Sequence, residues 1–416
     1  MNTLRLLLVP IAVAAVVGRA QAQEPPPRVT VTARERPEVD AVEHTLGGFD
    51  LATMLGVGSE HDDNVFATRN APRADTALWL EPAFELDSNW TRHSLSVAGD
   101  FKAVRYSDFS TEDYDDNSLR LTARIDVRDL SPLSFDLSRT EGVEGRESPD
   151  DRAGTERTKV NTDVARIAYA NERTRLKLEV GTEWTEFDYQ DGYRLNASVI
   201  NNDDRDRREA VAHVRVGYQV ATDYGFFVQA TANDRSYDQL RDDAGYNRSS
   251  KGSELALGIA LDRSGIVYGD FFGGYRRQQF EDARFEDVEG PTFGAALTWN
   301  VTALTTLSAL AERVLEDTTI VGVSGIESTR FRLAADHELL RNLILSLAID
   351  TEEEDFQGVE QTDDIRGVSF TLRYLMNRRL HVLGGYRTER RSSNVADPFA
   401  FEYAKDVYFV QLQGHF

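Results

Sequence analysis

The sequence contains no cysteine, few methionine and tryptophan residues, and only one long apolar run. Without cysteine, a disulfide framework and a thiolate metal site are both excluded. The apolar run 6–17 is too short to cross a bilayer as a helix, and no other stretch approaches the roughly twenty residues that such a helix needs. This shortage does not exclude a membrane protein, because a barrel strand turns only every second side chain toward lipid.

Basic residues are outnumbered by acidic ones, 47 to 70, so the formal net charge is −23. An acidic chain is a poor partner for nucleic acid, whose phosphates need a basic surface. Much of the acid falls in expected loops, where we interpret it as solvated surface, or alternatively as sites for divalent cations that bridge lipopolysaccharide. The sequence has no HExxH pair, no G-x-S-x-G elbow and no phosphate-binding glycine loop. We therefore expect no enzyme activity, no catalytic residues, no cofactor and no metal.

The N-terminal residues divide into two segments. Residues 1–22 read as a secretory signal peptide, with Arg5 before the apolar run and the small residues Ala20 and Ala22 at its end. Residues 23–48 are rich in proline and charge and predict a flexible periplasmic leader. The segment 29–34 resembles a TonB box, but strand-like sequence from Phe49 leaves no room for the plug domain of such a transporter. The remainder, 49–416, is expected to be one barrel in the bacterial outer membrane.

Alternation of apolar and polar residues is the dominant pattern from Phe49 onward. In the run 407–416, Tyr408, Val410 and Leu412 share one parity, and Gln411 and Gln413 share the other. Such alternation places one face in lipid and the other in water. Short and long connections alternate between these segments, as in bacterial outer-membrane barrels. The pattern predicts an all-β, transmembrane, antiparallel up-and-down barrel of about eighteen strands, with sixteen as the alternative.

The connections are expected at defined positions. Tight periplasmic turns are predicted near 88–92, 129–132, 171–174, 221–224, 262–265, 301–304, 340–342 and 377–378. Longer extracellular loops are predicted near 61–74, 110–116, 142–156, 190–205, 237–247, 281–289, 316–324, 352–363 and 392–401. The longest of these, 142–156 and 190–205, are the candidates for a loop that folds inward as a constriction.

Arginine recurs on the parity that we assign to the lumen. Two interpretations remain open: the arginines neutralise lumen carboxylates, or they line a track that tunes the passage of an anionic solute or polymer. The candidate lumen-facing charges are Arg120, Arg124, Arg166, Arg215, Arg276, Arg330, Arg332, Arg373 and Arg387.

One short motif is more specific than the alternation. His61 is followed by Asp62, Asp63, Asn64, Val65 and Phe66, which resembles the signature of a family of outer-membrane β-barrel porins often encoded with exopolysaccharide export genes. Further similar segments follow in order, at 90–95, 201–207, 297–302 and 336–342. For Asp62, Asp63 and Asn64 we expect a turn or rim-stabilising role rather than ligand binding, because Asp and Asn favour side-chain-to-backbone turns.

The resemblance implies a pore that serves as a conduit or accessory for exopolysaccharide or capsule-type polysaccharide secretion, beside a periplasmic polysaccharide export protein. A general or sugar-selective diffusion porin is the first alternative, and a structural barrel with acidic surface loops is the second. The expected partners are outer-membrane lipid and lipopolysaccharide, the export protein, and a polysaccharide or small solute in the pore.

Overall fold

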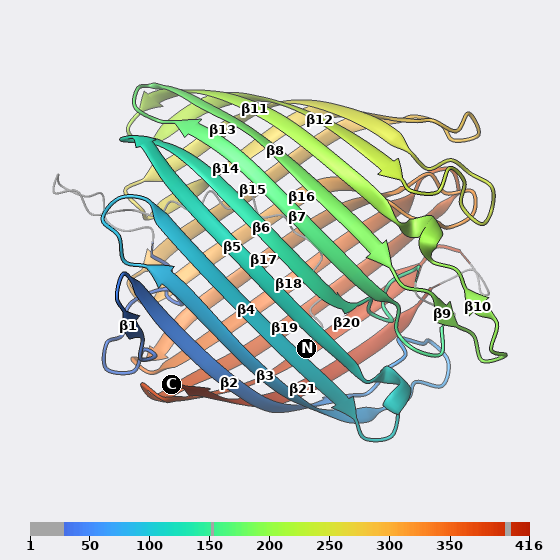
Figure 1. The fold of residues 1–416 in the computed structure, drawn as a ribbon, viewed down its shortest axis with the longest axis horizontal. Helices are drawn as coiled ribbons and strands as arrows, with labels where there is room; N and C mark the ends of the chain where they lie inside the picture. Colours follow the sequence, from blue (N-terminus) through green and yellow to red (C-terminus); the bar gives the residue numbers. More distant parts are fainter. Residues whose placement is uncertain (1–28, 151–153, 396–400) are drawn as a thin grey trace.

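A computed structural model describes residues 29–150, 154–395 and 401–416 (Figure 1). The predicted signal peptide, 1–22, lies outside the described residues. Within them, nearly every residue from Phe49 onward belongs to a strand or to the connection between two strands. Two single-turn 3₁₀ helices, η1 (Ser110–Glu112) and η2 (Asp203–Arg205), lie in loops. Among the described residues, no helix is long and apolar enough to span a membrane.

Eighteen long strands form the wall, as predicted. In chain order they are β2 (Phe49–Asp62), β3 (Asp75–Ser88), β4 (Ser94–Tyr106), β5 (Tyr114–Arg128), β6 (Ser131–Val143), β7 (Lys159–Asn171), β8 (Leu176–Tyr189), β11 (Arg207–Ala221), β12 (Tyr224–Tyr237), β13 (Ser250–Arg263), β14 (Val267–Phe280), β15 (Val288–Thr302), β16 (Thr305–Glu316), β17 (Ile326–Leu340), β18 (Leu343–Phe356), β19 (Gln361–Asn377), β20 (Leu380–Ser393) and β21 (Tyr403–His415). Three short strands complete the set: β1 (His44–Leu46), which pairs with β2, and β9 (Gly192–Tyr193) with β10 (Val199–Ile200).

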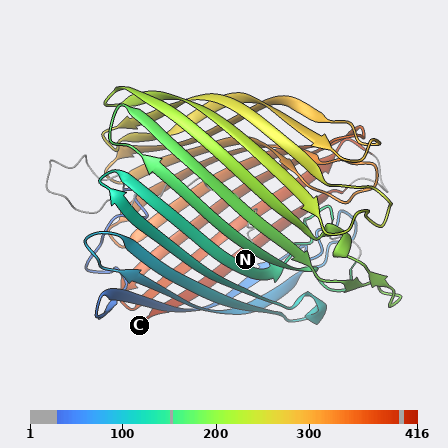
Figure 2. The same ribbon diagram turned by 45° about the horizontal axis from the view of Figure 1, so that its top comes forward.

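The sheet closes on itself. Each long strand is antiparallel to the next in the chain, and the last strand, β21, pairs with the first, β2, from Met54 opposite His415 to Asp62 opposite Val407. Among the strands described, closure leaves no free sheet edge around the barrel, which satisfies the backbone groups that lipid cannot bond. Figure 2 shows the strands running steeply tilted around the wall, as closure of a barrel requires.

The two faces follow the predicted alternation. On β21, Tyr408 and Val410 are 54% and 53% exposed, whereas Val407 and Gln411 are 4% and 8% exposed. Outward apolar side chains meet lipid, and inward side chains pack on one another and on the loops. The alternation read from the sequence therefore describes the wall correctly.

The connections agree with the prediction except at one place. Short turns lie at one end of the barrel together with the C-terminus, and the long loops lie at the other (Figure 1). The loop predicted at 352–363 is wrong, because β18 continues to Phe356 and β19 begins at Gln361. The acidic run that suggested a loop is strand: its inward members Glu352 and Glu354 contact Arg330 and Arg391.

Candidate functional site: the inner wall of the barrel

The strand register places the nine candidate arginines on one face. Residues that lie opposite each other in a sheet point to the same side, and the register can be followed around the whole ring. Thr122 lies opposite Asp136, Asp136 opposite Arg166, and Arg166 opposite Glu183. Followed through every strand pair, the same face carries all nine: Arg120, Arg124, Arg166, Arg215, Arg276, Arg330, Arg332, Arg373 and Arg387. It is the face of Val407 and Gln411, the lumen side.

On β5 to β8 the lumen arginines share carboxylates across strands. Arg120 and Arg166 both bond to Asp136, and Arg166 also bonds to Glu183. Arg124 donates from Nε to Asp126 at 2.8 Å on its own strand. This part of the wall is a chain of ion pairs in which each of these cations meets at least one carboxylate.

On the opposite part of the wall the pairing continues. Arg332 bonds to Asp350 at 2.7 Å. Arg330 donates from Nε to Glu352 at 2.7 Å and also contacts Glu316. Pairs of this kind neutralise most of the positive charge that an arginine track would need.

The remaining candidates occupy more varied surroundings. Arg215 pairs with Asp270 at 2.7 Å, and its guanidinium lies 3.5 Å from the centroid of the Phe227 ring. Arg276 donates to Glu327 at 2.6 Å. Arg373 lies opposite Leu383, and Arg387 lies opposite Val407 and lines a small cavity with Glu147 and Lys405.

Several lumen carboxylates bond to hydroxyl or amide groups rather than to cations. Asp100 accepts from Ser118, Asp336 accepts from Ser346, and Glu81 accepts from Gln411 at 2.8 Å. Because the arginines are mostly paired while these carboxyl groups bond to no cation among the described residues, acidic side chains outweigh basic ones on the lumen surface. Such a surface disfavours anions and is compatible with neutral or cationic solutes.

The motif formed by Asp62, Asp63 and Asn64 lies at the seam where the barrel closes. Asp62 pairs with Lys405 of β21 at 3.0 Å, and Asp63 accepts the backbone N–H of Asp406 at 2.7 Å. The fully buried Asn64 donates from Nδ2 to the carbonyls of Ala404 (2.9 Å) and Thr68 (2.8 Å). The motif therefore ties the end of the first strand and its loop to the last strand.

The described parts of the extracellular loop between β6 and β7, residues 144–150 and 154–158, fold inward over the mouth. Its Glu147 contacts Lys405 of β21, and its Arg146 and Arg157 both bond to Glu112 of η1, at 2.7 and 3.0 Å. Burial by itself would raise the pKa of Glu147, but Lys405 and Arg157 outweigh it and hold the pKa at about 2. The loop that the sequence suggested as a constriction, 142–156, is thus anchored across the mouth by buried ion pairs.

The hairpin formed by β16 and β17 also bends inward at its extracellular end. β15 and β16 pair only as far as Gly294 opposite Glu312, and the part of the hairpin beyond that point reaches the inner side of other strands. In the connecting loop, Asp317 pairs with Arg207 at 3.4 Å and with Arg235 at 3.2 Å. The carboxylate of Asp150 joins the two inward elements, because it accepts from the hydroxyl of Thr318 at 2.9 Å.

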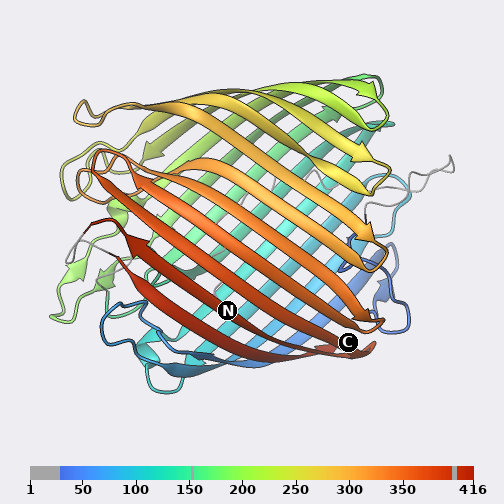
Figure 3. The same cartoon turned by 180° about the vertical axis from the view of Figure 1, so that it is seen from behind.

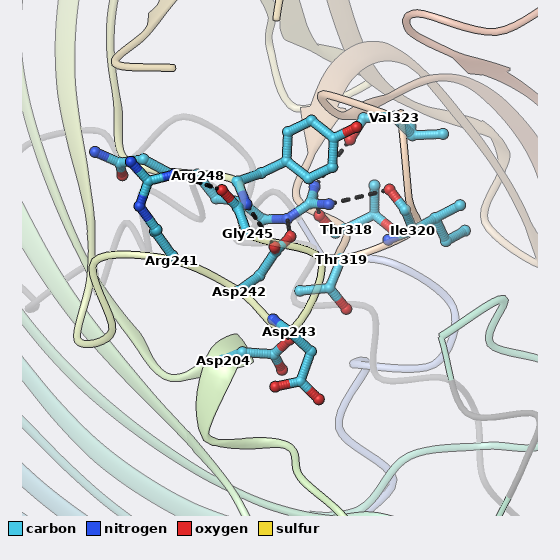
Figure 4. Close-up of polar contacts among 12 residues, drawn as sticks. Asp204, Arg241, Asp242, Asp243, Gly245, Arg248, Thr318, Thr319, Ile320 and Val323 are labelled. Atoms are coloured by element: carbon cyan, nitrogen blue, oxygen red, sulfur yellow. Dashed lines mark hydrogen bonds and ion pairs between the residues drawn. The ribbon is translucent and has the colours of Figure 1, made fainter. Parts of the chain in front are cut away.

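Arg248 holds the loop between β16 and β17, residues 317–325, in place (Figure 4). The side chain is 3% exposed. Its guanidinium donates to the carboxylate of Asp242 at 2.6 Å and to the carbonyls of Val323 (2.8 Å), Ile320 (3.0 Å) and Thr318. One buried cation therefore holds three carbonyls of the 317–325 loop against the loop that precedes β13.

At the periplasmic end, the described part of the predicted flexible leader packs inside the barrel. Arg36 is 1% exposed and donates to Glu338 of β17 at 2.7 Å. The backbone N–H of Val31 donates to the hydroxyl of Thr306 at 3.0 Å, and the carbonyl of Val39 lies 2.9 Å from Nε2 of His381. The structure differs here from the expectation, because residues 31–39 have specific partners on the inner wall from β16 to β20.

Sequence reasoning missed the residues that occupy the two ends of the lumen. Glu147, Arg248 and Arg36 belong to segments without alternation, and their partners lie far away in the chain. Lys405 could have been noticed, since it has the lumen parity of β21. Among the described residues, no group of three or more histidine or acidic side chains is placed to hold a metal ion.

Comparison with known proteins identifies the family. The family model described as "Putative beta-barrel porin 2" matches residues 36–416. None of the curated proteins matches the chain. Among solved structures, the siderophore receptor PirA from Pseudomonas aeruginosa is 10% identical, with 92% of this chain and 81% of that chain covered and a TM-score of 0.45. OpdO from Pseudomonas aeruginosa is 13% identical, with 88% and 97% covered and a TM-score of 0.43. The family assignment does not depend on these structures. By its family match over nearly its whole length, the chain belongs to "Putative beta-barrel porin 2" and is an outer-membrane β-barrel with a porin-like pore.

Proposed function

We propose that this barrel is a passage for carbohydrate through the outer membrane, and that its main role is as a conduit or accessory in the secretion of an exopolysaccharide. The observation that carries the proposal is the state of the lumen charges. Arg120, Arg166 and Arg332 are bound to carboxylates across the strands rather than free to hold an anion. A polar wall whose cations are mostly paired with carboxylates is compatible with the passage of a neutral or weakly charged polysaccharide, which presents mainly hydroxyl groups to the wall.

Passage also requires that no single position binds the solute too tightly. Hydroxyl and amide groups such as Ser118, Ser346 and Gln411 face the lumen and are already engaged with carboxylates. A carbohydrate can exchange hydrogen bonds with such groups one at a time, with small changes in free energy. The family resemblance to porins encoded with exopolysaccharide export genes supports the same substrate class.

In this role the periplasmic end would receive the polymer from a periplasmic export protein. Residues 31–39 lie at that end, on the inner wall, so a partner that engages the N-terminal segment is placed to act on the entrance. The extracellular end would release the polymer past the inward residues 144–150 and 154–158.

A diffusion porin is the second candidate, and one observation favours it. Residues 144–150 and 154–158 of the loop between β6 and β7 fold into the mouth and are anchored to Lys405 and Glu112, as expected for a loop that sets the size limit of a porin. A sugar-selective porin would use the same acidic lumen to exclude anions.

Two measurements separate these candidates. If the barrel is a conduit, deletion of the gene should abolish surface polysaccharide while uptake of small solutes stays unchanged. If it is a diffusion porin, uptake should fall and surface polysaccharide should remain.

A planar-bilayer measurement tests the lumen charges that both roles share. Both roles predict that neutral sugars block ion current better than acidic sugars. Stronger block by acidic sugars would contradict the paired-charge interpretation of the lumen.

A further inference from the structure

Two arginines lie side by side on the outer surface of the wall. Arg366 of β19 and Arg390 of β20 are directly opposite each other in the register. Both are exposed, and both have the parity of lipid-facing residues such as Val368, not that of Arg391 and Glu389, which point inward. Their strands, orange-red, belong to the wall nearest the viewer in Figure 3.

Both arginines lie at the boundary between lipid and the extracellular side. Below Arg366, the outward residues of β19 are apolar or aromatic without interruption: Val368, Phe370, Leu372, Tyr374 and Met376. Below Arg390, Tyr386 faces outward and its ring lies 4.8 Å from that of Tyr408. Aromatic rings prefer the interfacial zone of a membrane, so Arg390, two outward positions beyond Tyr386 on β20, belongs to the depth of lipid headgroups.

Among the described residues, neither Arg366 nor Arg390 has an ion-pair partner. Like charges directly opposite each other destabilise a sheet, and neither side chain forms a hydrogen bond or ion pair with any described residue. Several outward arginines elsewhere at the extracellular end do have partners. Examples are Arg105 with Asp115 at 2.7 Å, Arg208 with Asp238 at 3.1 Å and Arg277 with Asp287 at 2.9 Å.

The neighbouring groups complete the description of the patch. Thr351 lies opposite Arg366, and Thr388 is the outward residue just below Arg390, so hydroxyl groups flank the two cations. One outward position farther from the membrane, Glu353 and Asp364 lie opposite each other. On the lipid side, the outward carboxylate of Asp406 lies opposite Thr388 and accepts from the hydroxyl of Tyr386 at 2.8 Å. Along β19 the outward order from lipid to solvent is therefore apolar, then cationic, then anionic.

We propose that Arg366 and Arg390 together bind a phosphate of an outer-leaflet glycolipid. Guanidinium groups bind phosphate with two parallel hydrogen bonds each, and one phosphate between them would neutralise the two like charges. The membrane itself brings headgroup phosphates to this depth. The site lies outside the lumen and is independent of what passes through the pore.

The test uses the full chain in nanodiscs of phosphatidylcholine that contain a small fraction of diphosphorylated lipid A. Bound lipid A is counted by native mass spectrometry as its fraction is raised. The double variant Arg366→Ala/Arg390→Ala should weaken binding by about tenfold or more, because each charge-assisted bond to the phosphate is lost. The matched control, Arg208→Ala/Arg277→Ala, removes the same charge from outward arginines that already have partners, and it should bind as the unaltered chain does.

Several results would overturn the proposal. An equal loss in the control would show that only net charge matters. Unchanged binding in the double variant, with the barrel still folded by its heat-modifiable mobility on gels, would remove the site. Equal binding of lipid A without phosphates, or of phosphatidylglycerol, would show that the glycolipid phosphate is not recognised, and competition by millimolar inorganic phosphate would point to a free anion instead. The variant Glu353→Gln/Asp364→Asn should strengthen binding, and weaker binding would mean that these carboxylates hold the arginines or a bridging cation.

Discussion

At the scale of single residues, the position of a side chain on one face or the other decides the solvent that it meets. Leu121 lies opposite Val97 and Leu137 on the lipid side, while its neighbour Arg120 points to the lumen and bonds to Asp136. A shift of one residue along the strand moves a side chain from the lipid face to the aqueous lumen face. The free-energy cost of a substitution therefore depends on which face of the wall the position belongs to, more than on the residue type alone.

We expect Leu121→Arg to impair membrane insertion and Arg120→Leu to be tolerated. A charge that faces lipid near the midplane costs about 2–4 kcal/mol, whereas Asp136 keeps Arg166 as a partner when Arg120 is removed. The amount of heat-modifiable barrel in the outer-membrane fraction measures the difference. Equal losses of inserted protein in the two variants would contradict the facing of β5.

A second residue-scale prediction concerns the closing seam. Asn64→Ala should lower the free energy of unfolding by about 2–4 kcal/mol, because its side chain makes four hydrogen bonds in a buried position. The partly exposed Asn161, with one bond to Asp188 at 3.2 Å, is the matched control, and Asn161→Ala should have little effect. Thermal unfolding of the purified barrel in detergent provides the comparison, and similar midpoints for both variants would count against a role of Asn64 in the seam.

At the scale of elements, alternation was enough to predict the strands, the turns and the closure, since each depends on local pattern and even strand number. The inward elements were not predictable in the same way. The β16–β17 hairpin keeps its alternation beyond Glu312, and nothing in that pattern indicates that it leaves β15 and bends into the lumen. Arg36 and Glu338 are too far apart in sequence for any local rule to join them.

The inward loop should open in acid. The pKa of Glu147 is about 2, below its ordinary value of 4.5, because Lys405 and Arg157 outweigh the effect of burial. The anchor is therefore fully present above pH 4.5 and is lost as the pH falls from 4.5 toward 2. Single-channel conductance should rise over this interval in the unaltered chain.

The variant Glu147→Gln should show the same release at neutral pH, with a higher conductance that no longer changes in that interval. Glu286→Gln, at an exposed position of another extracellular loop, is the control and should keep the acid-induced rise. If both variants kept the pH profile of the unaltered chain, the carboxylate of Glu147 would not be the group that anchors the loop.

At the scale of the whole molecule, the lumen is occupied at both ends by segments from different parts of the chain. Residues 31–39 lie along the periplasmic inner wall, and residues 144–150 and 317–325 meet at the extracellular mouth through Asp150 and Thr318. Narrow stretches in one channel act in series, so their resistances add. Relief of one stretch then leaves the other to limit the current.

We therefore expect Arg36→Ala and Glu147→Gln each to raise conductance only in part, and the double variant to raise it by more than the two single increases together. Arg36→Ala acts because it breaks the contact of the N-terminal segment with Glu338.

A disulfide can hold the N-terminal segment in place as a further test. Because the chain has no cysteine, the variants Val31→Cys and Thr306→Cys introduce a single thiol pair where the segment meets β16. In the oxidised form, the chain with the disulfide and Glu147→Gln should conduct at the level of the Glu147→Gln single variant. Adding Arg36→Ala to this oxidised chain should not raise the conductance. Reduction of the disulfide should then raise the conductance to the level of the Arg36→Ala/Glu147→Gln double variant. Simple addition of the two effects, with no response to reduction, would show that the two ends do not limit the same current.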